Sequence, residues 1–301
     1  MPSDVLSPPT IDSRDASVSA VIPVYNRFEY LEECLQSVYG QTQVPDEVLV
    51  VDDCSSKSVE EYLAKTPFRD RVRILRPDRN RRASGARNWG WMHARNRLIA
   101  FLDSDDLWEP FKIEHQVLQL QSNPEAAGVY GGMTAFYPDG TAHPWAHDRP
   151  PRVTLATALA DCNICVQTLL IKRSALEKVG GFDESLAILD DQELAIQLAL
   201  RDETILYFPD PPLTRYRRNS QNISGNAQGY FKEEMTINRR YSNLMNRIYG
   251  PGSRRVHAGR AIARFGSKVK YLGAITRLTA NVLKYSAPRS KMPLDGWLVD
   301  T

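Results

Sequence analysis

The chain has 301 residues, of which 42% are hydrophobic and 25% are charged, proportions typical of a soluble globular protein with a substantial core. It contains no apolar run of the ~18 residues that a membrane-spanning helix needs. Its four cysteines are too few for a disulfide scaffold, which favours a reducing cytoplasm. The net charge of +2 hides an asymmetry: residues 1–234 hold 25 Lys and Arg against 34 Asp and Glu, whereas residues 235–301 hold 13 against 2.

The N-terminal half of the chain alternates between apolar runs and segments with helical spacing. Strands are expected at 18–25, 47–53, 72–75 and 98–102. Helices are expected at 84–96, at 110–121 and around the i, i+3, i+4, i+7 series of Leu31, Cys34, Leu35 and Val38. Strands separated by helices, without an internal repeat, predict an α/β protein whose mostly parallel sheet is flanked by helices.

The C-terminal half is less regular. The elements expected there are a strand at 166–171, a helix at 173–184 with a glycine stop at Gly180–Gly181, a helix at 191–200 and extended chain at 204–217. The proline-rich segment 137–151 is expected to be a surface loop, with a lid over a substrate as the alternative. From about Gly229 the sequence predicts basic helices, including a stripe of Arg260, Arg264 and Lys268.

Polar side chains follow three of the predicted strands where each strand ends. They form the clusters Tyr25-Asn26-Arg27, Asp52-Asp53 and Asp103-Ser104-Asp105. Open α/β sheets bind ligands at the carboxyl ends of their strands, so these clusters are expected to line one crevice. Carboxylates this close together repel one another, and burial strengthens the repulsion. A positive charge supplied from outside the cluster is therefore expected beside them.

Six sequence pieces occur in an order and spacing that resemble family 2 glycosyltransferases of the GT-A fold. They are 18-VSAVIPVYNR-27, 48-VLVVDDCSS-56, 85-GARNWG-90, 100-AFLDSDDLW-108, 179-VGGFDE-184 and 190-DDQEL-194. The resemblance covers about residues 18–224. It implies a GT-A glycosyltransferase domain at 16–228. The segment 1–15 lacks the basic and apolar regions of a signal peptide and is expected to be a disordered leader. The basic, mostly helical extension expected at 229–301 matches no motif of the family.

The resemblance also implies roles for individual residues in an enzyme that uses a nucleotide-sugar donor and Mn²⁺ or Mg²⁺. Pro23, Tyr25 and Asp53 would contact the nucleotide base, and Arg87 would lie near the nucleotide. Asp103 and Asp105 match the family's DxD motif around Ser104, which we assign to the donor site, with Asp105 the more direct metal ligand. Asp191 matches the family's catalytic base and would act as the general base.

The chain departs from the family pattern at two positions near these residues. Asp190 stands where the family often has Glu, and Asn219 stands where it often has His, which puts a metal ligand from that loop in doubt. An alternative assignment makes Asp190 the functional acid, while Asp191 caps its helix.

Each candidate also has a purely structural interpretation. Asp103 and Asp105 could cap a helix, and Asp53 could cap the next turn with Ser55. Arg87 could be a surface cation paired with an acid, and Pro23 and Tyr25 could pack at the strand end. The Cys162-x-x-Cys165 pair lacks the second pair that zinc sites usually have, so packing is the expected role.

Three other functions compete with glycosyl transfer. A phosphate-ester hydrolase would use the first Asp of a DxDx[TV] motif as nucleophile, but Asp106-Leu107 interrupts that pattern. A nucleotidyltransferase would carry a glycine-rich loop after the first strand, and 23–30 contains no glycine. An inactive nucleotide-sugar-binding protein would have lost acids that are all present in this sequence.

Donor and acceptor remain open at this level. UDP-sugars are the family's commonest donors, with dTDP- and GDP-sugars as alternatives, and the acceptor hydroxyl could belong to a glycan in polysaccharide biosynthesis, a lipid-linked sugar or a small molecule. The basic extension could contact an anionic membrane, pack on the body or on a second subunit, or bind nucleic acid. The last is disfavoured, because no aromatic residues interleave with the basic ones. The expected location is the cytoplasm, with peripheral contact at the inner face of the membrane as the variant.

Overall fold

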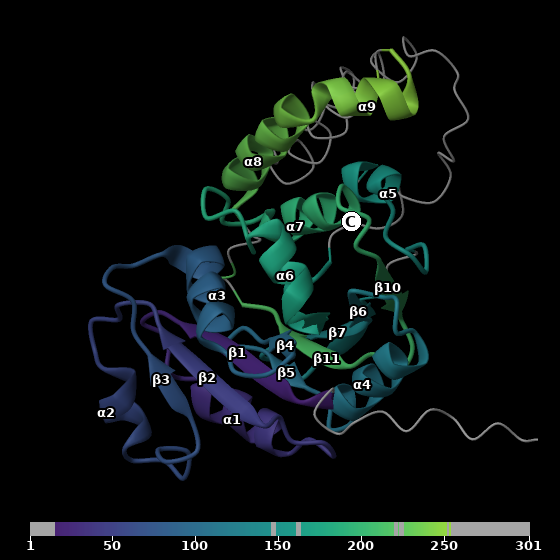
Figure 1. Cartoon of the computed structure of the whole chain (residues 1–301). Coiled ribbons are helices and arrows are strands. Elements are labelled where there is room, and N and C mark those ends of the chain that lie inside the picture. The colour runs from purple at the N-terminus through teal and green to yellow at the C-terminus, as the bar shows by residue number, and fades with distance from the viewer. Residues whose placement is uncertain are drawn as a thin grey trace, which may run out of the picture.

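A seven-stranded sheet forms the centre of the molecule (Figure 1). The computed structural model describes residues 16–145, 149–160, 164–219, 222, 226–251 and 253. The sheet has the order β10-β6-β9-β4-β1-β2-β3, and all neighbours are parallel except β9, which runs antiparallel to β4 and β6. Its strands are β1 Val18–Val24, β2 Glu47–Asp52, β3 Arg73–Leu75, β4 Leu98–Phe101, β6 Gly128–Gly131, β9 Leu170–Lys172 and β10 Ile205–Phe208. The mostly parallel α/β sheet predicted from the sequence is confirmed.

Helices cover both faces of this sheet, because successive side chains of a strand point to opposite sides and nearly all of them are apolar. In β1, Val21 lies in one buried cluster with side chains of α3, α6 and α7, whereas Ala20 and Ile22 lie in a second cluster with those of α1, α2 and α4. The helices are α1 Leu31–Tyr39, α2 Val59–Leu63, α3 Arg82–His93, α4 Lys112–Ser122, α5 Leu155–Ala160, α6 Arg173–Val179, α7 Asp190–Ala199, α8 Ala227–Arg240 and α9 Ser242–Tyr249.

A second sheet of four short strands lies beside the first, in the order β5-β11-β7-β8. These strands are β5 Leu107–Trp108, β11 Thr214–Arg217, β7 Met133–Phe136 and β8 Ala142–Trp145. The expectation of a plain loop over 137–151 is therefore wrong at β8, which pairs antiparallel with β7. The sheet matters for the site, because β5 follows the acidic cluster directly and β11 ends beside it.

The apolar run 166–171 begins differently from the predicted strand. Val166–Thr168 is a 3₁₀ turn, and only Leu170–Lys172 pairs as β9. The turn forms because Thr168 donates both its backbone N–H (2.9 Å) and its hydroxyl (2.7 Å) to the Cys165 carbonyl. The helix expected at 110–121 also begins later than predicted. It is α4, which begins at Lys112, so Pro110 precedes the helix.

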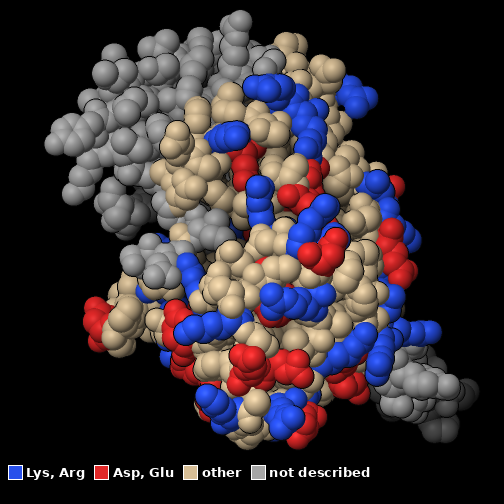
Figure 2. All heavy atoms as spheres, turned by 90° about the vertical axis from the view of Figure 1, so that its left-hand side faces the viewer, with Lys and Arg blue, Asp and Glu red and all other residues tan. Residues whose placement is uncertain are grey.

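The first part of the predicted basic extension packs on the body. Ile237, Tyr241 and Met245, from α8, its C-cap and α9, belong to the same buried cluster as Leu198 of α7. The predicted leader 1–15, Cys162 and the stripe Arg260 to Lys268 lie outside the described residues. In the part of the chain that is described, no helix is both long enough and apolar enough to cross a membrane. On the face that carries α2 and β3, basic and acidic side chains are interspersed (Figure 2).

Candidate functional site

The carboxyl ends of β4, β1 and β2 meet at one edge of the sheet, because the three strands are adjacent and parallel. Asn26 has φ +56°, a conformation that asparagine tolerates better than most residues, and it joins two of these ends. Its N–H donates to Ser55 Oγ (3.0 Å), and its Oδ1 accepts from the Ser56 N–H (2.8 Å). The predicted base-contacting residues lie here: Tyr25 is exposed, and Pro23 is half-buried within β1.

Asp53 faces the loop that leads into α3. Its Oδ1 accepts from the Arg81 N–H at 2.7 Å, and Asn80 Nδ2 donates to its backbone carbonyl at 2.9 Å. Burial raises the pKa of Asp53, and the amides around it oppose the rise. The alternative in which Asp53 caps a turn with Ser55 is wrong, because the Ser55 N–H donates to Asp52 Oδ1 at 2.9 Å instead.

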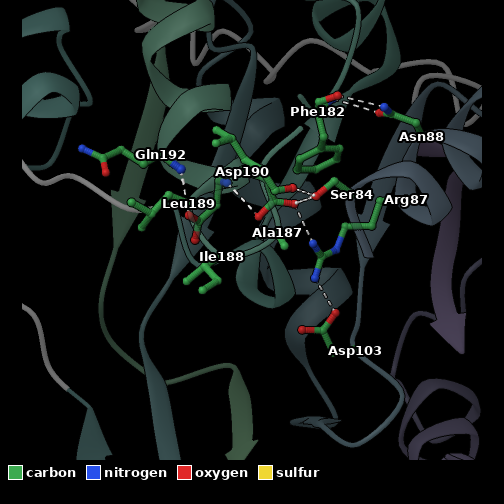
Figure 3. A network of polar contacts seen from close by, with 12 residues as sticks. Ser84, Arg87, Asn88, Asp103, Phe182, Ala187, Ile188, Leu189, Asp190 and Gln192 are labelled. Carbon is green, nitrogen blue, oxygen red and sulfur yellow. Dashed lines mark hydrogen bonds and ion pairs between the residues drawn. The ribbon is translucent and has the colours of Figure 1, made fainter. Parts of the chain in front are cut away.

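Arg87 of α3 is buried and joins two acids from distant parts of the chain (Figure 3). Its Nη2 donates to Asp103 Oδ1 at 2.7 Å and its Nη1 to Asp190 Oδ2 at 2.8 Å. Burial disfavours the charge on Arg87, but the two carboxylates outweigh it and raise its pKa above the ordinary value. Ser84, one helical turn earlier, donates its hydroxyl to the same Asp190 oxygen at 2.8 Å. The interpretation of Arg87 as a surface cation is therefore wrong.

Two further arginines, Arg27 and Arg217, lie beside the acids that follow β4. Arg27 Nη1 lies 3.5 Å from Asp105 Oδ2. Arg217, at the end of β11, donates its Nε to the Asp105 carbonyl (2.8 Å) and its backbone N–H to Asp106 Oδ1 (2.8 Å). Burial, and then the charge of Asp103, raise the pKa of Asp105, while Arg27 lowers it. Together with Arg87, these contacts explain how three acids share one strand end.

The chemistry of this strand end suits a hard divalent cation, which prefers oxygen ligands. Asp103 and Asp105 present carboxylate oxygens around the half-buried Ser104, and Asn219 Nδ2 lies 3.5 Å from Asp105 Oδ2, which brings a further amide to the cluster. Asp106 Oδ2 is buried without a hydrogen-bond partner in the described structure. Within the described ranges, no group of three His, Cys, Asp or Glu side chains could hold a metal by itself. The residues therefore fit a metal that shares its coordination with phosphate oxygens and water.

Asp191 lies in the first turn of α7, immediately after the acid that Arg87 binds. Burial, and then the charge of Asp190, raise its pKa to about 7, although part of the side chain stays accessible. The Gln192 N–H (2.7 Å from Asp191 Oδ1) and, less strongly, Arg149 oppose this rise. A carboxyl group with this pKa changes its charge near neutral pH, as a general base needs to do.

The hydrogen bonds of the two neighbouring acids differ. Asp190 uses both of its oxygens, one for the Asp191 N–H (3.1 Å) and the other for Ser84 and Arg87. In the described part of the chain, the carboxylate of Asp191 accepts only the bond from Gln192. Asp190 is thus held in place, and Asp191 retains an oxygen that a substrate hydroxyl could use.

Several residues of this site were missing from the sequence-based assignment. The sequence indicates Ser84 only through its spacing, three residues before Arg87 on the same helical face. Arg27 lies in the motif 18–27, but the resemblance implies no role for it. No sequence signal placed Arg217, because its partner Asp106 lies 111 residues away along the chain.

Comparison with known proteins agrees with this geometry. Residues 19–180 match the family model described as Glycosyl transferase family 2. The putative teichuronic acid biosynthesis glycosyltransferase TuaG of Bacillus subtilis is 30% identical over 229 residues, which are 75% of this chain and 89% of the relative. The Escherichia coli protein WfgD, named as a UDP-Glc:alpha-D-GlcNAc-diphosphoundecaprenol beta-1,3-glucosyltransferase, is 28% identical over 238 residues, 78% of this chain and 90% of the relative.

A solved structure shows the same fold. The mannosyltransferase PcManGT from Pyrobaculum calidifontis, in complex with GDP-Man and Mn²⁺, superimposes with a TM-score of 0.59 at 21% identity, covering 97% of this chain and 80% of its own. The sheet and its helices therefore define the GT-A fold. The chain belongs to glycosyl transferase family 2.

Proposed function

We propose that this glycosyltransferase moves a sugar from a UDP-sugar to a hydroxyl group of a lipid-linked or polysaccharide acceptor, with inversion at the anomeric carbon. One observation carries the proposal: Arg87 connects the acidic cluster after β4 to the Asp190-Asp191 pair of α7. This arrangement would bring a site for a diphosphate next to a carboxylate that can accept a proton. The names of TuaG, for teichuronic acid biosynthesis, and of WfgD, for a UDP-Glc donor and a diphosphoundecaprenol-linked acceptor, support this choice of acceptor and donor.

The donor would lie along the strand ends. Pro23, Tyr25 and Asp53 would contact the base, while Arg87, Asp103 and Ser104 would contact the diphosphate and the sugar. UDP is favoured because WfgD is named for UDP-Glc; GDP, which PcManGT binds as GDP-Man, and dTDP are the alternatives.

Asp105 and Asp103 would hold Mn²⁺ or Mg²⁺. When bound, the ion would supply positive charge to the diphosphate leaving group, whose oxygens gain negative charge as the glycosidic bond breaks. The Mn²⁺ complex of PcManGT supports this ion class.

Asp191 would act as the general base. As the acceptor oxygen attacks the anomeric carbon, its proton would pass to Asp191, the bond from that carbon to the diphosphate oxygen would break, and the nucleoside diphosphate would leave. A single displacement of this kind inverts the anomeric centre. Arg87 would help by holding Asp190 away from the acceptor, so that the two neighbouring acids keep different roles.

The chain would be organised as a catalytic domain at 16–228 and an extension at 229–301, working in the cytoplasm at the inner face of the membrane. The net positive charge of residues 235–301 supports contact with anionic lipids. Flotation with vesicles that contain anionic lipid should show binding that weakens as salt is added, and equal binding to neutral vesicles would contradict the contact.

The test is a transfer assay with a panel of UDP-sugars and an undecaprenyl-diphosphate-linked N-acetylglucosamine acceptor. Wild type should form a glycosidic bond of inverted configuration, detected by mass and by NMR of the anomeric proton, and Asp191→Asn should lose most of this activity. Release of inorganic phosphate from simple esters, without transfer, would favour a hydrolase. Donor binding without transfer to any acceptor class would favour an inactive binding protein.

A further inference from the structure

The loop before α7 is held by a residue of the C-terminal extension. Glu233 of α8 accepts three consecutive backbone hydrogen bonds: its Oε1 from the Ala187 N–H (2.9 Å), and its Oε2 from the Ile188 (2.9 Å) and Leu189 (3.0 Å) N–H groups. These three residues directly precede Asp190, and Figure 3 shows them beside it.

This contact holds the chain immediately before α7, whose N-cap Leu189 has a side chain that cannot accept a hydrogen bond. In the first turn of the helix, the Asp191 and Gln192 N–H groups bond to the carboxylates of Asp190 and Asp191. Glu233 binds the N-cap amide and the two amides before it, from a separate helix, and adds a negative charge at the positive end of the α7 dipole.

We infer that Glu233 is a positioning residue for the base Asp191, an inference that rests on the proposed function. The carboxylate of Asp190 has side-chain anchors in Ser84 and Arg87, whereas the carboxylate of Asp191 accepts only the Gln192 N–H of its own helix in the described structure. The position of Asp191 therefore depends on how its helix begins, and Glu233 fixes that beginning. Because α8 starts at Ala227, almost at the predicted boundary of 228, the extension would contribute to the catalytic centre.

Other contacts attach α8 to the body, so the role of Glu233 can be separated from simple docking. Arg240, the last residue of α8, pairs with Asp183 at 2.7 Å and with Glu193 of α7 at 2.8 Å. The Tyr241 hydroxyl also donates to Glu193, at 2.5 Å. Loss of Glu233 would leave these bonds in place, and loss of Arg240 would weaken the docking without removing the acceptors for residues 187–189.

The experiment compares Glu233→Ala, Glu233→Gln and the control Arg240→Met with the wild type in the full chain. Hydrogen exchange of the amides of 187–189 reads the contact without any turnover, and we expect it to be at least about tenfold faster in Glu233→Ala only. For sugar transfer, we expect kcat to fall by about 10²-fold in Glu233→Ala, as for a catalytic group displaced by ~1 Å, with KM for the donor unchanged. Glu233→Gln keeps one acceptor oxygen and should recover part of both effects.

Unchanged exchange at 187–189 in Glu233→Ala would overturn the inference, as would an equal fall of kcat in Arg240→Met, because the role would then be structural only. Absence of transfer by the wild type would count against the proposed function, and the exchange result would still decide whether Glu233 holds the loop.

Discussion

At the scale of single residues, the site contains neighbouring acids whose side chains have different hydrogen-bond partners. Asp190 and Asp191 are adjacent in sequence, yet Arg87 and Ser84 engage the first, while burial and the charge of the first raise the pKa of the second to about 7. The same pattern occurs after β4, where Asp105 meets Arg27 and Asp106 meets the backbone of Arg217. Opposite charge and hydrogen bonds from other elements offset part of the burial and repulsion that raise the pKa values of Asp105, Asp106 and Asp191.

The raised pKa of Asp191 leads to a pH dependence with a definite direction. Because the base must be ionised, and its pKa in the free protein is about 7, kcat/KM should rise with pH and level off above about 8. A profile of kcat/KM from pH 5.5 to 9 measures this, and circular dichroism at each pH confirms that the protein stays folded. An activity that is constant below pH 7, or that falls as pH rises through 7, would contradict the assignment.

A second residue-scale prediction concerns Lys112, which is fully buried in α4. Its ammonium group donates to Gln116 Oε1 at 2.6 Å and lies 4.4 Å from the centroid of the Trp108 ring, and burial lowers its pKa to about 7. Between that pKa and the unfolded value of about 10.4, the unfolded chain binds a proton that the folded chain lacks, so this group makes stability rise with pH across that window.

Lys112→Met should remove this rise of stability with pH, because the new side chain does not titrate. It also leaves the buried Gln116 Oε1 without its donor, a loss of about 1–3 kcal/mol that applies at every pH. The free energy of unfolding of the variant relative to wild type should therefore fall between pH 7 and pH 10. Urea unfolding of both proteins at pH 7, 8.5 and 10 measures the difference, and a difference that is the same at all three pH values would contradict the prediction.

At the scale of elements, the glycine pair after α6 connects two parts of the site. Gly180 (φ +80°) is the left-handed C-cap of α6, as the sequence predicted, and an added Cβ there would meet nothing within 4 Å. Gly181 (φ +79°) has the same backbone conformation, but a Cβ would collide with Asn88 Oδ1 and lie 2.7 Å from Trp91 Nε1. Asn88 Oδ1 accepts from the Phe182 N–H at 2.9 Å and so ties α3 to the loop before α7.

Gly180→Ala is thus a matched control for Gly181→Ala. The first should cost about 1–2 kcal/mol, the ordinary penalty of a side chain in the left-handed region. The second should cost about 2 kcal/mol more, because it also breaks buried hydrogen bonds of Asn88. Urea denaturation measures the difference, and equal losses in the two variants would show that the contact with α3 is not stabilising.

Much of the central sheet was predictable because its strands are buried on both faces and read as continuous apolar runs. The small sheet was not, since β5 has only two residues, and β7 is short and follows β6 of the central sheet after the single residue Gly132. The strand-end polar clusters were predictable from their places at the ends of β1, β2 and β4. Arg217, which contacts the acids after β4, and Glu233, which contacts the loop before α7, were not, because only the folded chain brings β11 and α8 beside these segments.

At the scale of the whole molecule, the family model matches only part of the described structure. It ends at residue 180, before α7 begins at Asp190, so the proposed base lies in the part of the chain that the model does not match. The described helices beyond that point, α7, α8 and α9, contribute side chains to the same buried cluster as the body. The described start of the extension at 229–301 therefore packs on the proposed catalytic domain.

The proposed donor site at the strand ends would bind a nucleoside diphosphate together with a divalent metal held by Asp105. The direct measurement is thermal stabilisation of the full chain by UDP, dTDP and GDP, each with and without Mn²⁺, in wild type, Asp105→Ala and the control Asp70→Ala, whose side chain is exposed. A ligand at about 100 times its Kd stabilises the folded state by about 2.7 kcal/mol, which a melting curve resolves. We expect a shift with UDP that requires Mn²⁺, persists in Asp70→Ala and disappears in Asp105→Ala. No shift with any of the three nucleotides, or a shift that survives Asp105→Ala unchanged, would contradict the proposed donor site.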